Sequence, residues 1–254
     1  MSEYIPEKAL FIAAHPDDLE FGVAGTAAKW AAAGSEVTFC LITDGNAGTH
    51  EEGMTAEKLA EIRREEQLEA AKILGVKNVE FLGYDDCKLV NTLELREKLV
   101  RLIRKYQPNI LGCQDPTNVF PRSDYINHPD HRAAGGAAID AAFPSSEMPL
   151  LYPNIDAEGY PPHKANYVYV FFTTDDKVNQ YVDISDHIDT KIESLRAHKS
   201  QMGDWDPEPR IKEWAAGSGK QVGFSYAERY FRITLKEPDK PEVGVGKKKV
   251  ESDK

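Results

Sequence analysis

Strand-like and helix-like segments alternate along the first half of this chain, and their order restricts the possible folds more than any other feature of the sequence. Four short apolar segments have the composition of buried strands: residues 9–14, 37–42, 79–82 and 109–113. Between them lie longer segments with the hydrophobic spacing of helices: residues 21–33, 55–74 and 91–106. Because strand–helix–strand units build parallel sheets, this order predicts an α/β fold with a mainly parallel sheet and helices on both faces.

Local signals mark where the expected helices begin and end. Gly34 and Gly75 each follow an expected helix directly, where glycine commonly terminates one. Asn91, with Glu94 three residues later, resembles a capping box and predicts the start of the third helix. Parallel sheets of this kind bind ligands beyond the carboxyl ends of their strands, so polar residues that follow the strands are the first candidates for a site.

The second half is less regular. We expect a helix over residues 132–142, strands over residues 167–172 and 181–184, and a helix over residues 188–200. The segment 144–163 contains five prolines and is expected to shape the pocket or an oligomer contact. The expected organisation is one α/β domain over residues 1–235, followed by a flexible charged tail, residues 236–254, which has few apolar groups.

Charge and composition exclude several classes of protein. The chain carries 31 basic and 42 acidic residues, a net charge of −11, which argues against a protein that binds nucleic acid through a basic surface. No apolar run approaches the roughly 20 residues that span a bilayer, and the first residues lack the pattern of a signal peptide. Cys40, Cys87 and Cys113 show no disulfide or zinc-knuckle spacing. These features predict a protein of the reducing cytoplasm, with no nucleic-acid partner and no membrane partner.

Two short motifs of His and Asp follow predicted strands. The first, AHPDD, comes directly after the first strand. If the chain turns helically there, His15 and Asp18 share a face and can bind one metal, while Asp17 projects elsewhere and is free to act on something bound to it. The second motif, HPDH, lies between the fourth strand and the next helix, and its residues His128 and His131 have the same spacing.

One imidazole of the second motif completes a set of two histidines and a carboxylate with His15 and Asp18. Three protein ligands leave an open position for water, as in catalytic zinc sites, and zinc lowers the pKa of that water to about 7. A carboxylate can then take the water's proton, and an imidazolium can stabilise an oxyanion or protonate a leaving amine. A single His beside a strand is more often a hydrogen-bonded core residue, so the prediction depends on the two clusters together. Iron, manganese or cobalt would also suit these ligands.

The two motifs and their neighbours resemble the LmbE/PIG-L family of zinc-dependent N-acetylglucosaminyl deacetylases. The other similar motifs are TDG at residues 43–45 and IRREEQLEAAKILGV in the helix that follows. The resemblance runs from about Lys8 to about Phe231. It implies a Rossmann-like fold, in agreement with the order of strands and helices above.

The resemblance also implies a role for each residue of the two motifs. The implied ligands of one zinc ion per chain are His15, Asp18 and His131. Asp17 would be the general base, and His128 would stabilise the oxyanion or protonate the amine. Asp130 would orient an imidazole behind the metal. From the residues alone, Asp130 is also a candidate N-cap of the following helix.

Four more residues are candidates for substrate contact. Arg63 and Asp86 stand where the family places residues that hold the sugar, although a solvated helix face and a turn would explain them equally well. Asp44 ends the second strand near the expected site, where a turn role is an equal alternative. Tyr125 could donate a hydrogen bond to an oxyanion. His198, in RAHKSQM, is expected at the end of a helix.

Three functions are compatible with this pattern to different degrees. The main hypothesis is removal of the N-acetyl group from a saccharide or conjugate that contains N-acetylglucosamine. A second hypothesis keeps the metal chemistry but acts on a thiol-sugar conjugate or another amide. A third, a non-catalytic sugar- or nucleotide-binding module, is disfavoured because there is no G-x-G-x-x-G and the acidic HPDD would repel a pyrophosphate. The expected partners are a small amino-sugar substrate and, by resemblance, further copies of the chain in a trimer or hexamer.

Overall fold

The strands form one sheet within residues 4–238, the part of the chain that the computed structural model describes. They are β1 (Lys8–Ala13), β2 (Glu36–Thr43), β3 (Asn78–Tyr84), β4 (Ile110–Gln114), β5 (Tyr167–Phe171), β6 (Gln180–Asp183) and β7 (Ala227–Thr234). Their order across the sheet is β3–β2–β1–β4–β5–β7–β6. Strands β1 to β5 are parallel, β7 is antiparallel to β5, and β6 is antiparallel to β7. The predicted mainly parallel α/β sheet is confirmed, while most of the predicted tail, residues 239–254, lies outside the described residues.

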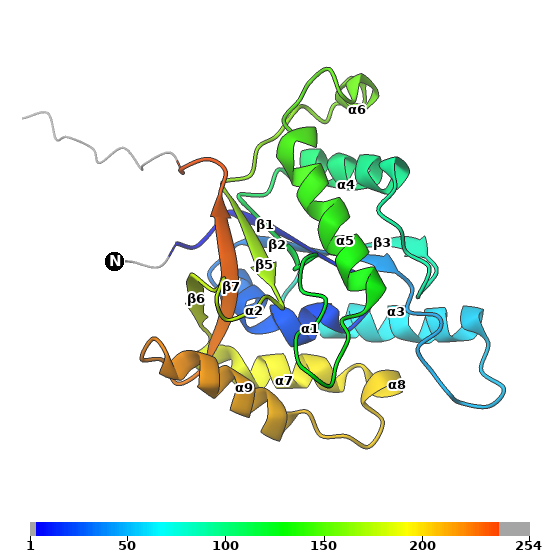
Figure 1. The fold of residues 1–254 in the computed structure, drawn as a ribbon, viewed down its shortest axis with the longest axis vertical. Coiled ribbons are helices and arrows are strands. Elements are labelled where there is room, and N and C mark those ends of the chain that lie inside the picture. The colour runs from blue at the N-terminus through cyan, green and yellow to red at the C-terminus, as the bar shows by residue number, and fades with distance from the viewer. Residues whose placement is uncertain (1–3, 239–254) are drawn as a thin grey trace, which may run out of the picture.

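Helices cover both faces of this sheet (Figure 1). They are α1 (Asp18–Gly22), α2 (Ala24–Ala32), α3 (Ala56–Ile73), α4 (Leu93–Tyr106), α5 (Pro129–Asp140), α6 (Pro153–Ala157), α7 (Ile188–Arg196), α8 (Lys199–Met202) and α9 (Glu208–Lys220), with short turns η1 (Ala141–Ser145) and η2 (Ser185–His187). Helices α4 and α5 pack on one face, and α2, α3, α7 and α9 pack on the other. Among residues 4–238, none of the helices combines the length and apolar character needed to cross a membrane.

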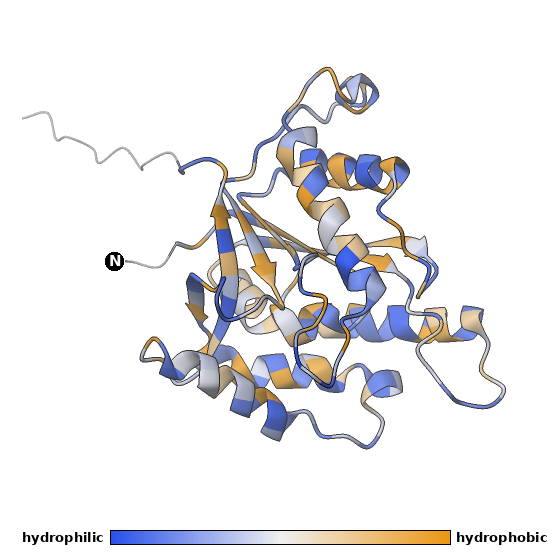
Figure 2. Ribbon diagram, viewed as in Figure 1, coloured by the Kyte–Doolittle hydropathy of each residue, from blue (hydrophilic) through white to orange (hydrophobic). Residues whose placement is uncertain are grey.

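The sheet divides the core into two layers, as the residues of β1 illustrate. Phe11 faces the cluster that contains Trp30 of α2, whereas its neighbours Leu10 and Ile12 face the cluster under α4 and α5. This alternation is the period of two of a β-strand, here apolar on both sides because both faces are covered. Figure 2 accordingly shows the central strands as mainly hydrophobic and the helices as mixed.

The strand order creates a crevice at one edge of the sheet. From β1 the chain moves outward through β2 and β3, and α4 then returns it to β4 on the other side of β1. At such a reversal, the connections that leave the carboxyl ends of the two central strands diverge and open a ligand site between them. Both histidine motifs follow these two strands, so the topology brings them together.

Three expected helix boundaries are wrong in detail. The helix expected over residues 21–33 is broken at Val23, whose φ of −139° and ψ of 1° end α1 before α2 begins. Helix α4 is capped by Thr92, whose side chain accepts from the backbone N–H of Leu95 at 3.2 Å, and not by Asn91. The helix expected over residues 188–200 divides into α7 and α8.

Strand β7 and helix α9 were not predicted from the sequence. β7 contains Glu228, which is buried at 6% exposure, and a buried carboxylate is not a strand signal. Its oxygens accept from the backbone N–H groups of Gly25 and Thr26 at the start of α2, and from Lys191 at 2.5 Å. These distant partners compensate the buried charge, and local sequence gives no sign of them.

Candidate active site

The first histidine motif lies in a tight turn between β1 and α1. The backbone N–H of His15 donates to Asp18 Oδ2 at 2.8 Å, and Asp18 Oδ2 also lies 3.2 Å from His15 Nδ1. Asp17 has a φ of 91°, in the left-handed region that costs a non-glycine residue about 1–3 kcal/mol. The turn therefore brings His15 and Asp18 together, as their spacing predicts, at the expense of strain in Asp17.

The second motif forms the start of α5. His128 is the N-cap residue, and its Nδ1 accepts the backbone N–H of Asp130 at 3.2 Å. Pro129 occupies the first helical position, where its missing N–H is not needed. The alternative N-cap role of Asp130 is therefore wrong, because the helix begins one residue before Asp130.

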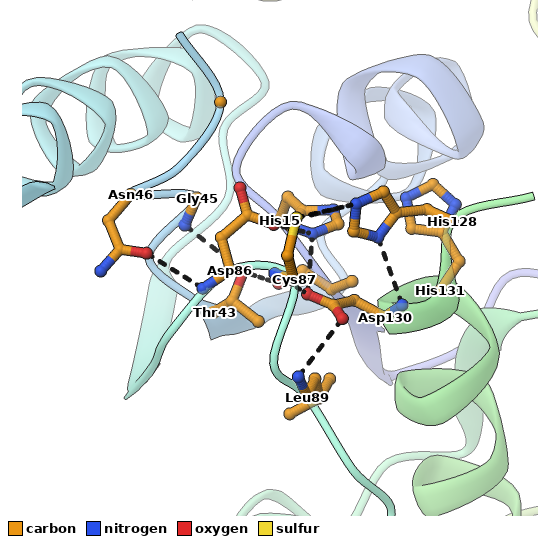
Figure 3. Close-up of polar contacts among 12 residues, drawn as sticks. His15, Thr43, Gly45, Asn46, Asp86, Cys87, Leu89, His128, Asp130 and His131 are labelled. Carbon is orange, nitrogen blue, oxygen red and sulfur yellow. Dashed lines mark hydrogen bonds and ion pairs between the residues drawn. The ribbon is translucent and has the colours of Figure 1, made fainter.

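Asp130 instead ties the loop after β3 to α5. Its Oδ2 accepts from the backbone N–H of Cys87 at 2.7 Å, and its Oδ1 accepts from that of Leu89 at 3.3 Å. The same Oδ2 lies 3.3 Å from His15 Nε2. Figure 3 shows the carboxylate between this loop and His15. Asp130 thus fixes both the imidazole of His15 and the loop that carries Asp86.

Carboxylates and imidazoles alternate through the centre of the site. Asp18 Oδ1 lies 3.0 Å from His131 Nε2, and Asp86 Oδ1 lies 3.0 Å from His15 Nε2. Burial alone would raise the pKa of Asp18, but the adjacent His131 and His15 hold that pKa well below its usual value. Burial alone would lower the pKa of His15, but hydrogen bonds to Asp130, Asp18 and Asp86 raise it well above its usual value. The centre of the site is therefore strongly charged, with His15 and Asp18 buried at the floor of the site cavity.

Two overlapping groups of side chains have ligand atoms close enough to hold a metal ion. One is His15, Asp18 and His131, and the other is His15, Asp86, His128 and Asp130. In the first group, His131 Nδ1 lies 3.1 Å from Asn127 Oδ1 and Nε2 lies 3.0 Å from Asp18 Oδ1, so the tautomer that donates from Nδ1 to Asn127 presents the Nε2 lone pair to a metal ion beside Asp18. In the second group, both Asp130 oxygens already accept backbone N–H groups. The hydrogen bonds thus favour the first group.

Asp17 stands beside this cluster and is paired with Arg63. Burial raises the pKa of Asp17 to about 6, and the Arg63 charge opposes that rise. Arg63 Nη2 donates to Asp17 Oδ2 at 3.2 Å and to the Pro16 carbonyl at 2.6 Å, and its Nη1 donates to the Gly45 carbonyl at 2.9 Å. A Cβ on Gly45 would lie 2.2 Å from Nη1, so a glycine is required there. Only 3% of Arg63 is exposed, yet it still borders the site cavity.

The site cavity has a volume of about 350 Å³. Eight of its lining residues are those singled out from the sequence: His15, Asp17, Asp18, Arg63, Asp86, Tyr125, His128 and His131. The ninth is Gln201 of α8, which the sequence analysis missed because only its neighbour His198 drew notice. Asp44 is not among the lining residues, and its backbone N–H donates to the Tyr84 carbonyl at 2.9 Å, which extends the pairing of β2 with β3. A larger cavity of about 600 Å³ lies between α9, β5 and β7, but its buried charges are the paired Lys191 and Glu228.

Comparisons with known proteins agree with this arrangement. The sequence profile described as "PIG-L: GlcNAc-PI de-N-acetylase" matches residues 10–142. A diacetylchitobiose deacetylase of Thermococcus kodakarensis is 37% identical over 87% of this chain and 81% of its own length. A probable N-acetyl-alpha-D-glucosaminyl L-malate deacetylase 2 of Bacillus anthracis is 27% identical over 91% of this chain and 97% of its own. The solved structure of N,N'-diacetylchitobiose deacetylase from Pyrococcus horikoshii superposes with a TM-score of 0.82 at 33% identity, covering 90% of this chain and 84% of that one.

Proposed function

Because this chain belongs to the PIG-L family of metal-dependent deacetylases, we propose that it removes the N-acetyl group from a short saccharide that contains N-acetylglucosamine, with diacetylchitobiose as the first candidate. The reaction adds water to an amide and releases acetate and a free amine. The observation that carries the proposal is the group His15, Asp18 and His131 at the reversal of the strand order, with Asp17 beside it. The substrate class rests on the named activities of the similar proteins.

His15, Asp18 and His131 are the proposed ligands of one zinc ion per chain. Metal-binding imidazoles commonly donate their second N–H to a carboxylate or carbonyl. Asp130 and Asp86 lie next to His15 Nε2, and Asn127 lies next to His131 Nδ1, so both rings have such a partner on the far side from Asp18. Two imidazoles and one carboxylate are a ligand set of catalytic zinc sites. Zinc held there would act as a Lewis acid on the acetyl carbonyl and on water.

Asp17 is the proposed general base. Its carboxylate borders the cavity beside the ligand group, and with a pKa of about 6 it is ionised at neutral pH yet basic enough to accept a proton. The carboxylate takes a proton from the attacking water as the bond from that water's oxygen to the acetyl carbon forms. Arg63 holds Oδ2, which leaves Oδ1 for the water.

His128 is proposed to assist on the opposite side of the cleaved amide. Burial lowers the pKa of His128, so its neutral form is favoured. Because Nδ1 accepts the Asp130 N–H, the proton of the neutral ring is on Nε2. This N–H can donate a hydrogen bond to the carbonyl oxygen as negative charge develops there. The proton that Asp17 took from the water then passes to the amine nitrogen as the C–N bond breaks, and acetate and the free amine leave.

The remaining candidates are proposed to bind the sugar. Asp86 and Tyr125 line the cavity from two different loops and offer a carboxylate and a phenol to hydroxyl groups. Arg63 offers the part of its guanidinium that borders the cavity, whereas Asp44 at the end of β2 does not line the cavity and is left out of the proposed sugar site. We further propose a cytoplasmic enzyme, in keeping with the free thiols of Cys40, Cys87 and Cys113, and a trimeric or hexameric assembly.

Acetate release tests this proposal directly. The purified chain would be assayed with N-acetylglucosamine, diacetylchitobiose, and N-acetylglucosaminyl conjugates of inositol and malate. Each substrate would be tested as purified, after chelation, and after zinc is restored. We expect release from diacetylchitobiose that chelation abolishes and zinc restores. Release from a conjugate alone would move the substrate to that conjugate, and no release from any of the four with zinc bound would refute the proposal.

A further inference from the structure

The peptide group between Pro16 and Asp17 is held at both ends by one helix. Its carbonyl oxygen accepts from Arg63 Nη2 at 2.6 Å, and its N–H donates to Gln67 Oε1 at 3.2 Å. Arg63 and Gln67 are four residues apart on α3, so their side chains leave the same face of the helix. Helix α3 thus fixes the orientation of the peptide plane that precedes Asp17.

That orientation determines the backbone conformation of Asp17. A flip of this plane by about 180° would carry φ from 91° to negative values, which non-glycine residues prefer. The flip would also exchange the positions of the carbonyl and the N–H, and both hydrogen bonds to α3 would be lost. Arg63 and Gln67 therefore oppose the relaxation that would otherwise relieve the strain in Asp17.

Gln67 is held in turn by a buried acid–base pair. Gln67 Nε2 donates to Glu20 Oε1 at 2.7 Å, and Glu20 Oε2 lies 3.3 Å from His198 Nε2. All three residues have a relative exposure of 0%. Burial alone would lower the pKa of His198, but Glu20 raises it above its usual value. Charges buried this deeply contribute little net stability, and here they fix which end of the Gln67 amide faces Asp17.

We propose that Gln67, Glu20 and His198 are positioning residues for the base. They orient the Gln67 amide so that its oxygen holds the Asp17 N–H, and this keeps the Asp17 carboxylate directed into the site cavity. The inference rests on the proposed role of Asp17. From the sequence, His198 was expected only to lie at the end of a helix. The proposal gives it a role behind the site, as the partner of Glu20.

A swap of the two interacting side chains tests this proposal. Gln67→Glu removes the donor to Glu20 and sets two carboxylates against each other, whereas adding Glu20→Gln restores a donor–acceptor pair in the reverse direction. At pH 8 we expect Gln67→Glu to lower kcat roughly 10- to 100-fold, the effect of a displaced catalytic group, with KM and zinc content unchanged. The double variant should recover kcat to within about threefold of the wild type, since it restores the positioning. Glu69→Gln, on the exposed face of α3, is the control and should keep the wild-type kcat.

Crystal structures of the single and double variants would show the orientation of the peptide between Pro16 and Asp17 independently of any activity measurement. We expect a negative φ at Asp17 in Gln67→Glu and the wild-type value in the double variant. An unchanged kcat in Gln67→Glu, or a double variant as impaired as the single one, would overturn the proposal. So would a loss of activity that merely follows a loss of zinc or of folded protein. If the wild type released no acetate from any substrate, the proposed function would fail, while the structural comparison would still decide whether the swap controls Asp17.

Discussion

Nδ1 of His128 accepts the backbone N–H of Asp130 at 3.2 Å, so the residue proposed to stabilise the oxyanion is also the N-cap of α5. Capping and catalysis can be separated, because asparagine caps helices well but lacks an imidazole. We expect His128→Asn to keep the thermal stability of the wild type and to lower kcat by roughly 10²–10³-fold, the usual effect of removing an oxyanion donor. His128→Ala should lose the same activity and, in addition, about 1 kcal/mol of unfolding free energy. Wild-type turnover in His128→Asn would exclude the catalytic role.

Asn127 offers a test of the metal site that leaves every proposed ligand in place. Its Oδ1 accepts from His131 Nδ1 at 3.1 Å and so turns Nε2 toward Asp18. Loss of such a partner typically weakens metal binding by 10–100-fold. We expect this decrease in zinc affinity for Asn127→Leu, measured by competition with a chelating dye, and a larger one for His131→Ala. His187→Ala, outside the site, is the control. Equal affinity in all three variants and the wild type would exclude His131 as a ligand.

The ion pair between Lys191 and Glu228 lies away from the site, and its contribution to the free energy of unfolding can be tested separately. Both residues are more than 90% buried, and their charged atoms lie 2.5 Å apart. Removing one partner of such a pair leaves an uncompensated buried charge and costs about 3–5 kcal/mol. Lys191→Met should therefore lower the free energy of unfolding by about that amount in urea titrations. Lys72→Met removes a lysine that is 77% exposed and should change it by less than about 0.5 kcal/mol. A similar small change in both variants would contradict the prediction.

The lowered pKa of His163 predicts that the free energy of unfolding decreases as the pH falls. Burial lowers the pKa of this imidazole, and its Nε2 lies 2.8 Å from the Pro108 carbonyl oxygen, to which it donates. The folded state therefore binds its proton less readily than the unfolded state, whose His pKa is about 6.5. The contribution of His163 to the free energy of unfolding is fully present above about pH 6.5. It is lost as the pH falls through the pKa of His163 in the folded state. We expect urea titrations at pH 7.5 and 5 to show a smaller decrease in stability for His163→Gln than for the wild type. Equal decreases would show that His163 does not contribute.

The sequence was sufficient to predict the fold class because the first half has regular strand and helix periodicity. Prediction from the sequence failed for segments whose conformation depends on contacts with residues far away in the chain. Glu228 lies in a strand only because α2 and Lys191 neutralise it, and the helix break at Val23 has no Pro nearby to announce it. In the site, too, contacts between residues far apart in the sequence could not be predicted.

The two histidine motifs supplied five of the nine residues that line the cavity, whereas Arg63 and Asp86 were singled out through the resemblance to the family. The supporting residues Gln67, Glu20 and His198 were not recognised as a group, because they lie on α3, on α1 and before α8, far apart in the sequence. The left-handed conformation of Asp17 was also not predictable, since no glycine marks it. The proline-rich segment 144–163 supplies none of the described residues that line the site cavity.

The most direct test of the central claim compares the wild type with Asp17→Asn, both loaded to the same zinc content per chain. The substitution keeps the size of the side chain and removes its ability to accept a proton. We predict that zinc stays bound while kcat for acetate release from diacetylchitobiose falls by roughly 10²–10⁴-fold, the usual contribution of a general base. Near-normal turnover by a pure, zinc-loaded Asp17→Asn protein would contradict the account.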